Sequence, residues 1–187
     1  GLKMVYISTD YVFSGEGDIT FEVDSPKHPM NVYGKSKLDG EEVVSENVLK
    51  HFIIRISWAF GINGNNFINT MLRIGREKGE VKVVNDQIGS PTYTYDIAKL
   101  ISDMIVTDKY GTYHATNENY CSWYEFAKEI FKQASLDVNV IPVDSSEFPV
   151  KAKRPKNSRL SKKSLDLAGF NRLRPWEEAL SDYLSKI

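Results

Sequence analysis

A tyrosine and a lysine four residues apart, Tyr33 and Lys37, are the first candidates for chemistry in this 187-residue sequence. They lie in Tyr33-Gly34-Lys35-Ser36-Lys37, at a predicted helix start, and residues at i and i+4 share one helix face. A free tyrosine titrates near pH ~10, and a cation beside its hydroxyl lowers that pKa. Such a pair can give or take a proton near neutral pH. Taken alone, the same spacing also fits a tyrosine that packs over a lysine stem.

A second candidate, Ser8-Thr9-Asp10-Tyr11-Val12-Phe13, follows the short apolar run Met4–Ile7. Consecutive apolar residues of this kind are typical of an interior strand in a parallel sheet that is covered on both faces. In open α/β sheets, ligands bind at the carboxyl ends of such strands. Small hydroxyl groups there can hydrogen-bond a substrate oxygen. The alternative is a capped turn in which Asp10 bonds its own backbone.

Two further loops are predicted at the same sheet edge. Trp58 follows a second apolar strand and is either a platform for a ring-shaped ligand or a core residue. For a lone tryptophan, core packing is the commoner role, while its place just past the carboxyl end of a strand, followed by Gly61 and Gly64, fits the ligand platform. Gln87 lies in the polar, turn-forming segment 85–93 between a predicted strand and a predicted helix.

The segment 151–163 near the carboxyl terminus is strongly basic. It holds seven basic residues and no acid: Lys151, Lys153, Arg154, Lys156, Arg159, Lys162 and Lys163. A solvated surface is the usual meaning of such a run. A diphosphate clamp is the sharper alternative, because the arginine guanidinium matches phosphate oxygens.

Short strands that alternate with helical stretches predict an α/β fold that positions these residues. A strand, helix and strand in succession indicate a right-handed parallel crossover. Strands are predicted near 3–8, 51–57, 81–84, 111–115 and 138–143. Helices are predicted near 33–49, 66–78, 95–106, 123–134 and 175–184, with one more short helix before the last. Ser122 and Glu125 predict a capping box for the helix at 123–134.

The composition argues against several classes of protein. With 24 basic and 25 acidic residues the net charge is -1, so we expect no nucleic-acid partner. The sequence contains no run of about 18 apolar residues, so no membrane span is predicted. The single cysteine, Cys121, fits a reducing compartment, and we expect a cytoplasmic protein. The histidines show no metal-ligand spacing, and the P-loop, the serine elbow and the Gly-rich dinucleotide fingerprint are all missing.

Taken together, the motifs resemble the dTDP-4-dehydrorhamnose reductase family of extended short-chain dehydrogenases/reductases. The resemblance rests on Ser8–Phe13, on Tyr33-x-x-x-Lys37, on Trp58 and on four later segments. These are Gly64-Asn65-Asn66-Phe67, Gln87–Thr92, Ser122–Ala127 and Arg154–Leu160. It implies the carboxyl-terminal part of a doubly wound, Rossmann-like parallel sheet with a small α/β substrate-binding lobe. Residues 1–60 and 94–117 are expected to form the Rossmann-like half, and 61–93 and 118–187 the substrate lobe.

The resemblance implies a catalytic set of Thr9, Tyr33 and Lys37. Hydride passes from NADPH or NADH to the C4 keto carbon of a nucleotide-linked 6-deoxysugar, and Tyr33 gives the proton. Thr9 bonds the substrate oxygen or the Tyr33 hydroxyl, and Lys37 bonds the nicotinamide ribose. Cofactor binding is expected at Ser8, Tyr33 and Lys37, and substrate binding at Asp10, Tyr11, Trp58, Asn66, Gln87 and Arg154. Magnesium occurs at a dimer interface in some members, but no acidic cluster here can be assigned to it, and a homodimer is one expected assembly.

Tyr11 separates related activities within this superfamily. Sugar-nucleotide dehydratases resemble Ser-Thr-Asp-Glu at this place, so Tyr11 favours reduction over dehydration, whereas epimerases are less cleanly excluded. A non-catalytic binding subunit, like the regulatory subunit of methionine adenosyltransferase, is the alternative.

The family's dinucleotide fingerprint belongs to a segment before Gly1. We therefore expect the 187-residue chain alone to bind NAD(P)H weakly, to lack turnover, and to shield its first strand by association.

Overall fold

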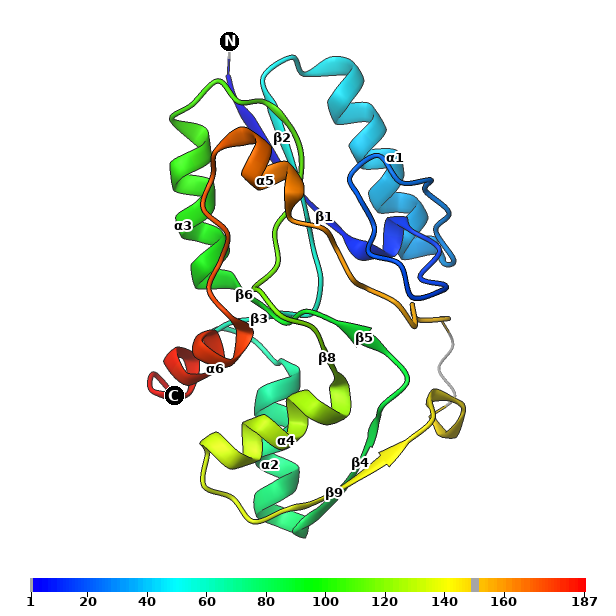
Figure 1. The fold of residues 1–187 in the computed structure, drawn as a ribbon, viewed down its shortest axis with the longest axis vertical. Coiled ribbons are helices and arrows are strands. Elements are labelled where there is room, and N and C mark those ends of the chain that lie inside the picture. Colours follow the sequence, from blue (N-terminus) through cyan, green and yellow to red (C-terminus); the bar gives the residue numbers. More distant parts are fainter. Residues whose placement is uncertain (1, 149–151) are drawn as a thin grey trace.

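The computed structural model describes residues 2–148 and 152–187, so Lys151 of the predicted basic run lies outside the described residues. A three-stranded parallel sheet of order β1-β2-β7 forms the centre of a first lobe (Figure 1). Its strands are β1 (Met4–Thr9), β2 (His51–Ile56) and β7 (Gly111–His114). Helix α1 (Val32–Asn47) connects β1 to β2, which confirms the predicted crossover.

Side chains alternate along β2 and fix which helix covers which face of the sheet. Phe52 and Ile54 share a buried cluster with Ile97 of α3 (Thr94–Ile105). Arg55, the residue after Ile54, points to the other face, where it pairs with Glu41 of α1. The sheet therefore lies between α1 and α3, as Figure 1 shows.

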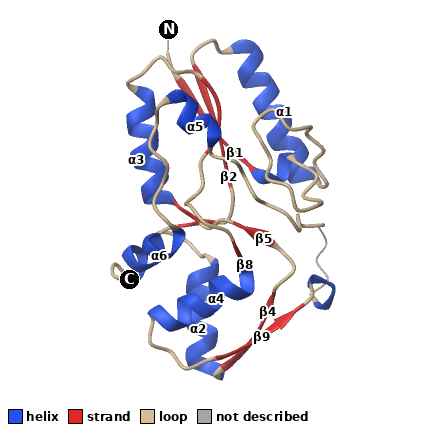
Figure 2. Cartoon of the chain, viewed as in Figure 1, coloured by secondary structure: helices blue, strands red, loops and turns tan. Residues whose placement is uncertain are grey.

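The second lobe is built on a pair of parallel strands, β4 (Glu80–Val84) and β9 (Asn139–Val143). Two helices, α2 (Phe67–Lys78) and α4 (Trp123–Gln133), pack against each other and against these strands (Figure 2). Helix α4 begins with the predicted capping box between Ser122 and Glu125.

Two pairs of two-residue strands lie between the lobes. Strand β3 (Ala59–Phe60) runs parallel to β6 (Thr92–Tyr93), and β5 (Ile88–Gly89) runs antiparallel to β8 (Cys121–Ser122). None of these was predicted, because a two-residue strand has no periodicity to read. The remaining elements are the 3-10 turns η1 (Asp10–Val12) and η2 (Ser145–Glu147) and the helices α5 (Lys163–Ala168) and α6 (Trp176–Leu184).

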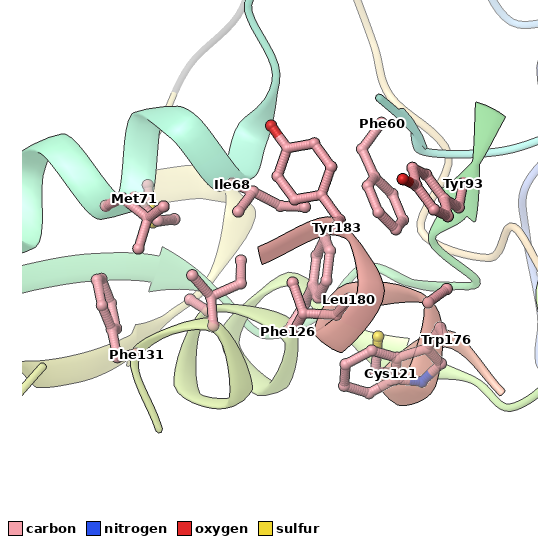
Figure 3. Close-up of a cluster of buried hydrophobic side chains, with 14 of the residues drawn as sticks. Phe60, Ile68, Met71, Tyr93, Cys121, Phe126, Phe131, Trp176, Leu180 and Tyr183 are labelled. Atoms are coloured by element: carbon pink, nitrogen blue, oxygen red, sulfur yellow. The ribbon is translucent and has the colours of Figure 1, made fainter. Parts of the chain in front are cut away.

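An aromatic core joins α6 to the second lobe. Phe60, Phe126 and Tyr183 pack within one buried cluster (Figure 3). The rings of Trp176 and Phe126 form a T-shaped pair whose centroids are 5.4 Å apart. Cys121 lies in the same cluster, as expected for a buried bystander. Burial and nearby carboxylates raise the pKa of its thiol, so the thiolate form is disfavoured.

The segment after the basic loop packs differently from the predicted division of the chain. Leu165, Phe170 and Leu173 lie in the cluster beneath the first-lobe sheet, and Leu160 joins a small cluster with Phe13. Residues 160–173 thus belong with the first lobe, whereas the sequence assigned 118–187 to the substrate lobe. The other predicted boundaries stay predictions; Phe60, at the predicted end of the first Rossmann-like segment, packs in the second-lobe cluster.

Candidate active site

The ends of β1, η1 and α1 meet at the carboxyl edge of the first-lobe sheet. The Thr9 side chain caps η1 by accepting from the Tyr11 backbone N–H over 3.3 Å. Gly34 allows α1 to approach η1, because a Cβ at this position would lie 2.2 Å from the Tyr11 carbonyl oxygen. The Tyr33 ring therefore lies edge-on to the Tyr11 ring, with centroids 5.5 Å apart. Thr9 and Tyr33 are brought to the same edge, as the sequence predicted.

Tyr33 and Lys37 have very different surroundings. Tyr33 is 52 % exposed, so its phenol is open to a ligand. Lys37 is anchored on β1, where its Nζ donates to the Ile7 carbonyl over 2.9 Å and lies 4.9 Å from the Tyr6 ring centroid. These contacts fix the lysine beneath the start of α1. The predicted tuning of Tyr33 by Lys37 stays a prediction.

Asp10 is buried between two hydroxyl groups. Thr9 Oγ1 donates to Asp10 Oδ1 over 3.0 Å, and Ser158 Oγ donates to Asp10 Oδ2. Burial raises the pKa of Asp10 to about 6, although the hydrogen bonds from both hydroxyls oppose that rise. Ser8, one residue before Thr9, has a buried Oγ for which the described residues provide no hydrogen-bond partner.

A cleft of about 1260 Å³ lies between the second lobe, the turn at 15–18 and the basic loop, and its described lining residues do not include Thr9, Tyr33 or Lys37. Phe67 and Trp123 line its apolar wall, and the predicted substrate residues Gln87 and Arg154 line it as well. The cleft is large enough for a ligand of several hundred Å³ and combines aromatic with charged walls. Further basic residues at its rim are Lys82, Lys153, Lys156 and Arg159.

Most of these rim cations are already paired with acids. Lys156 lies 2.7 Å from Asp86, while Lys153 and Lys82 lie 3.6 and 3.4 Å from Glu16 and Glu147. Arg159 lies 3.8 Å from Asp18. Within residues 2–148 and 152–187, Arg154 is the rim cation that takes part in no ion pair. Arg154 is thus the cation most available to an anionic ligand.

Trp58 stacks on Trp123, with ring centroids 3.7 Å apart and an interplanar angle of 15°. It adopts a left-handed backbone conformation, with a φ of 48°, at the turn after β2. Gly89 leaves room for its ring, because a Cβ there would lie 2.8 Å from Trp58 Cε2. The ring is half-buried against aromatic neighbours, and Trp123 supplies the tryptophan surface that lines the cleft. Direct contact of Trp58 with a sugar stays a prediction.

Asn66 has a structural role as a helix cap, and its predicted contact with the substrate stays a prediction. Its side chain caps α2 by accepting from the Asn69 backbone N–H, and its Nδ2 donates to Gly61 O and Tyr183 Oη, both over 3.0 Å. Asn66 lines a separate pocket of about 500 Å³ beside α3. A side chain with these bonds is an N-cap, which its place just before an amphipathic helix also indicates.

Trp123 and Ser158 lie within the segments Ser122–Ala127 and Arg154–Leu160, but the sequence predicted no role for either residue. Trp123 begins α4 and points from the second lobe to the cleft, whereas Ser158 reaches Asp10 from the basic loop. Each of these two residues meets segments that are far away in the chain, so the local spacing of residue types could not predict either role.

Two negative findings concern residues 2–148 and 152–187. No helix there is long and apolar enough to cross a membrane. The same residues contain no group of three or more His, Cys, Asp or Glu side chains that could hold a metal ion.

Comparisons with known proteins agree over the whole chain. Residues 1–187 match the family model described as the RmlD substrate binding domain. The chain is 43% identical to the spore coat polysaccharide biosynthesis protein SpsK of Bacillus subtilis, covering 100% of the chain and 65% of SpsK. It is 39% identical to the dTDP-4-dehydrorhamnose reductase of Aggregatibacter actinomycetemcomitans, covering 96% of the chain and 65% of that protein.

A crystal structure of dTDP-4-dehydrorhamnose reductase from Bacillus anthracis in complex with NADP matches with a TM-score of 0.96. Identity is 48%, over 99% of this chain and 66% of that one. The chain spans about two thirds of the length of these relatives. With a family model that matches every residue, the chain belongs to the RmlD substrate binding domain family.

Proposed function

We propose that this chain supplies the catalytic edge and the substrate cleft of an NAD(P)H-dependent reductase. The substrate is dTDP-4-dehydrorhamnose, whose C4 keto group is reduced to give dTDP-L-rhamnose. The meeting of Thr9, Tyr33 and the anchored Lys37 at one strand edge carries the proposal. Burial raises the pKa of Tyr11 at that edge, and Arg154 of the cleft, which has no ion pair among the described residues, is near enough for its charge to oppose that rise. The names of the relatives and their high identity support it.

The residues at the strand edge fit a nicotinamide cofactor. Ser8 Oγ is a buried hydroxyl without a partner among the described residues, at the strand end where this fold binds ligands. Tyr33 is exposed beside it, and Lys37 Nζ is half-buried. Ser8, Tyr33 and Lys37 would hold the nicotinamide ribose, and the bound cofactor supplies the hydride.

Tyr33 gives the proton in this proposal. Its exposed hydroxyl reaches the C4 oxygen, on which negative charge develops during reduction. Lys37, which is anchored on the Ile7 carbonyl beneath the helix start, bonds the nicotinamide ribose in this proposal. The edge-on Tyr11 ring restricts the orientation of Tyr33. A carboxyl group at position 11, which would suit elimination of water, is replaced here by a phenol.

The cleft provides the nucleotide side of the site. Arg154 binds the diphosphate, since it is the rim cation without an acidic partner among the described residues. Phe67 and Trp123 offer aromatic surface to the base and sugar. Gln87, 9 % exposed at the cleft wall, offers an amide for hydrogen bonding.

The proposal is tested with the complete gene product and dTDP-4-dehydrorhamnose. Loss of nicotinamide absorbance, with dTDP-L-rhamnose identified by mass and NMR, is the expected result, and NADH and NADPH are compared side by side. A purified, folded protein that binds dTDP but gives no product would favour a binding subunit instead. Sedimentation of the same sample tests the proposed homodimer, and cell fractionation tests the proposed cytoplasmic location.

A further inference from the structure

The carboxylate of Asp10 links Thr9 to the basic loop. It accepts from Thr9 on one oxygen and from Ser158 on the other. The exposed fractions of Thr9, Asp10 and Ser158 are 6, 4 and 2 %. With both carboxylate oxygens engaged and little surface exposed, Asp10 is poorly placed to bind the sugar, which is the role that the sequence resemblance had implied for it. It is better placed to hold Thr9.

These bonds set the direction in which Thr9 can hydrogen-bond. A threonine hydroxyl has one proton to donate and two lone pairs that accept. The Thr9 proton is directed to Asp10, and one lone pair accepts from the Tyr11 backbone N–H. One lone pair of the Thr9 oxygen remains for a further donor. Thr9 can therefore accept from the Tyr33 phenol or a sugar hydroxyl, but it cannot donate to the keto oxygen while Asp10 is ionised.

Ser158 is held by the packing of its own loop. Its backbone N–H donates to Ile88 O over 2.7 Å, and a Cβ at Gly89 would lie 3.0 Å from Ser158 Cβ. Earlier in the loop, Pro155 packs directly on Gly15, where a Cβ would come within 2.4 Å. The loop is thus fixed at two glycines, with Arg154 next to the first contact and Ser158 at the second.

We propose that Asp10 and Ser158 are positioning residues that hold Thr9 as a hydrogen-bond acceptor and couple it to the loop carrying Arg154. The inference rests on the proposed reductase function for its effect on catalysis. An anion bound at Arg154 stabilises the loop, the loop fixes Ser158, and Ser158 with Asp10 fixes the Thr9 hydroxyl. The reaction thereby becomes sensitive to the diphosphate, which is remote from the carbon being reduced.

Steady-state kinetics of three variants of the complete gene product test the positioning role. Asp10→Asn replaces one acceptor oxygen by a donor, and Ser158→Ala removes one donor. We expect kcat to fall about 10- to 100-fold in Asp10→Asn and about 10-fold in Ser158→Ala, the scale of a misplaced catalytic group, with KM nearly unchanged. Ser161→Ala, in the same segment, is the matched control and keeps wild-type kcat. Wild-type kcat in Ser158→Ala, or a loss confined to KM, overturns the proposal.

A second measurement does not depend on activity. Carbon-13 NMR follows the titration of the Asp10 carboxyl in the complete gene product, with Ser158→Ala and Arg154→Ala alongside. Loss of the Ser158 donor is expected to raise the Asp10 midpoint, because a bond to the ionised form is gone. The negative charge of bound dTDP would by itself raise the midpoint, whereas a firmer bond from Ser158 lowers it. We therefore expect saturating dTDP to lower the midpoint in the wild type, and we expect no lowering in Ser158→Ala or Arg154→Ala.

If neither Ser158→Ala nor saturating dTDP shifts the Asp10 titration midpoint, the coupling is refuted even when the enzyme is active. A wild-type protein without reductase activity refutes the proposed function, while the NMR response still decides whether loop and carboxylate are coupled.

Discussion

The inner edge of the candidate site and the outer rim of its cleft satisfy their polar groups in opposite ways. At the inner edge, several polar side chains are buried and bonded to fixed partners, as Asp10 is to Thr9 and Ser158. Arg55 and Glu41, with side chains 2 and 5 % exposed, form a two-bond ion pair beneath the strand ends. At the rim, charges are exposed and their ion pairs are single contacts, as for Lys153 and Glu16 at 67 and 72 % exposure.

This difference separates positioning from recognition. Buried bonded groups cannot exchange their partners for a ligand without leaving a charge desolvated and unpaired. Exposed ion pairs contribute little to stability and are screened by salt, so a phosphate can replace an acid at small cost. The inner edge is therefore suited to fix reacting groups, and the rim is suited to receive a charged substrate.

The largest expected effect comes from breaking the buried ion pair. Glu41→Gln leaves the Arg55 guanidinium desolvated without its carboxylate, and we expect a loss of about 3–5 kcal/mol in the free energy of unfolding. Urea unfolding measures the change. The matched control is Glu77→Gln, which removes an exposed pair with Arg73 in α2 and is expected to cost about 0.5 kcal/mol or less. Equal losses in both variants would contradict the contrast between edge and rim.

The next effect concerns the proton donor at the inner edge. Tyr33→Phe keeps the ring that packs on Tyr11 but removes the hydroxyl, so kcat should fall by a factor of at least ~10². Turnover with NAD(P)H and the keto sugar is the measurement, on the complete gene product. Tyr95→Phe is the control, because Tyr95 is similarly exposed, at 49 % against 52 %. Near-wild-type turnover in folded Tyr33→Phe would remove Tyr33 from the mechanism.

A smaller effect is expected at the rim. Arg154→Ala removes one charge-assisted contact to the diphosphate, which corresponds to about a 10-fold weaker dTDP affinity. Calorimetry with dTDP measures it. Lys153→Ala should have a smaller effect, since Lys153 already faces Glu16 at 3.6 Å. If Lys153→Ala weakens dTDP binding more than Arg154→Ala, pairing does not decide which cation receives the phosphate.

The sequence predicted the long elements and the strand-edge residues well. Amphipathic helices and apolar strands have local periodicity, so every helix of nine or more residues was placed to within about two residues of its observed ends. Thr9 and Tyr33 could be placed at the sheet edge because each lies at the end or the start of such an element; their catalytic roles stay predictions. Asn66 is the N-cap of α2, and its predicted contact with the substrate stays a prediction, because an N-cap and a ligand-binding amide have the same local sequence. The bond from Ser158 to Asp10 spans 148 residues, and no periodicity reports a contact of that range.

Two buried groups with opposed pKa shifts give the last and smallest expected effect. Burial, aided by the charge of Arg55, lowers the pKa of His114 from 6.5 to about 3, whereas burial raises that of Asp10 from 3.8 to about 6. As pH falls below ~6.5, His114 binds a proton in the unfolded chain but stays neutral in the native chain. The contribution of neutral His114 to the free energy of unfolding is therefore lost as pH falls. As pH rises through the window from 3.8 to about 6, the native chain keeps a proton on Asp10 longer than the unfolded chain does. The contribution of Asp10 to the free energy of unfolding is therefore lost as pH rises.

Between pH ~4 and ~6 the two contributions oppose each other, and their combined effect on the free energy of unfolding should be small. Single variants expose each slope. His114→Gln leaves Asp10, so stability should fall with rising pH, and Asp10→Asn leaves His114, so stability should rise with pH. Either slope approaches at most about 1.4 kcal/mol per pH unit. Urea midpoints across this range provide the measurement. Parallel pH profiles for the wild type and both variants would show that neither buried group titrates differently in the native chain, and the inner edge would then lose its distinction from the solvated rim.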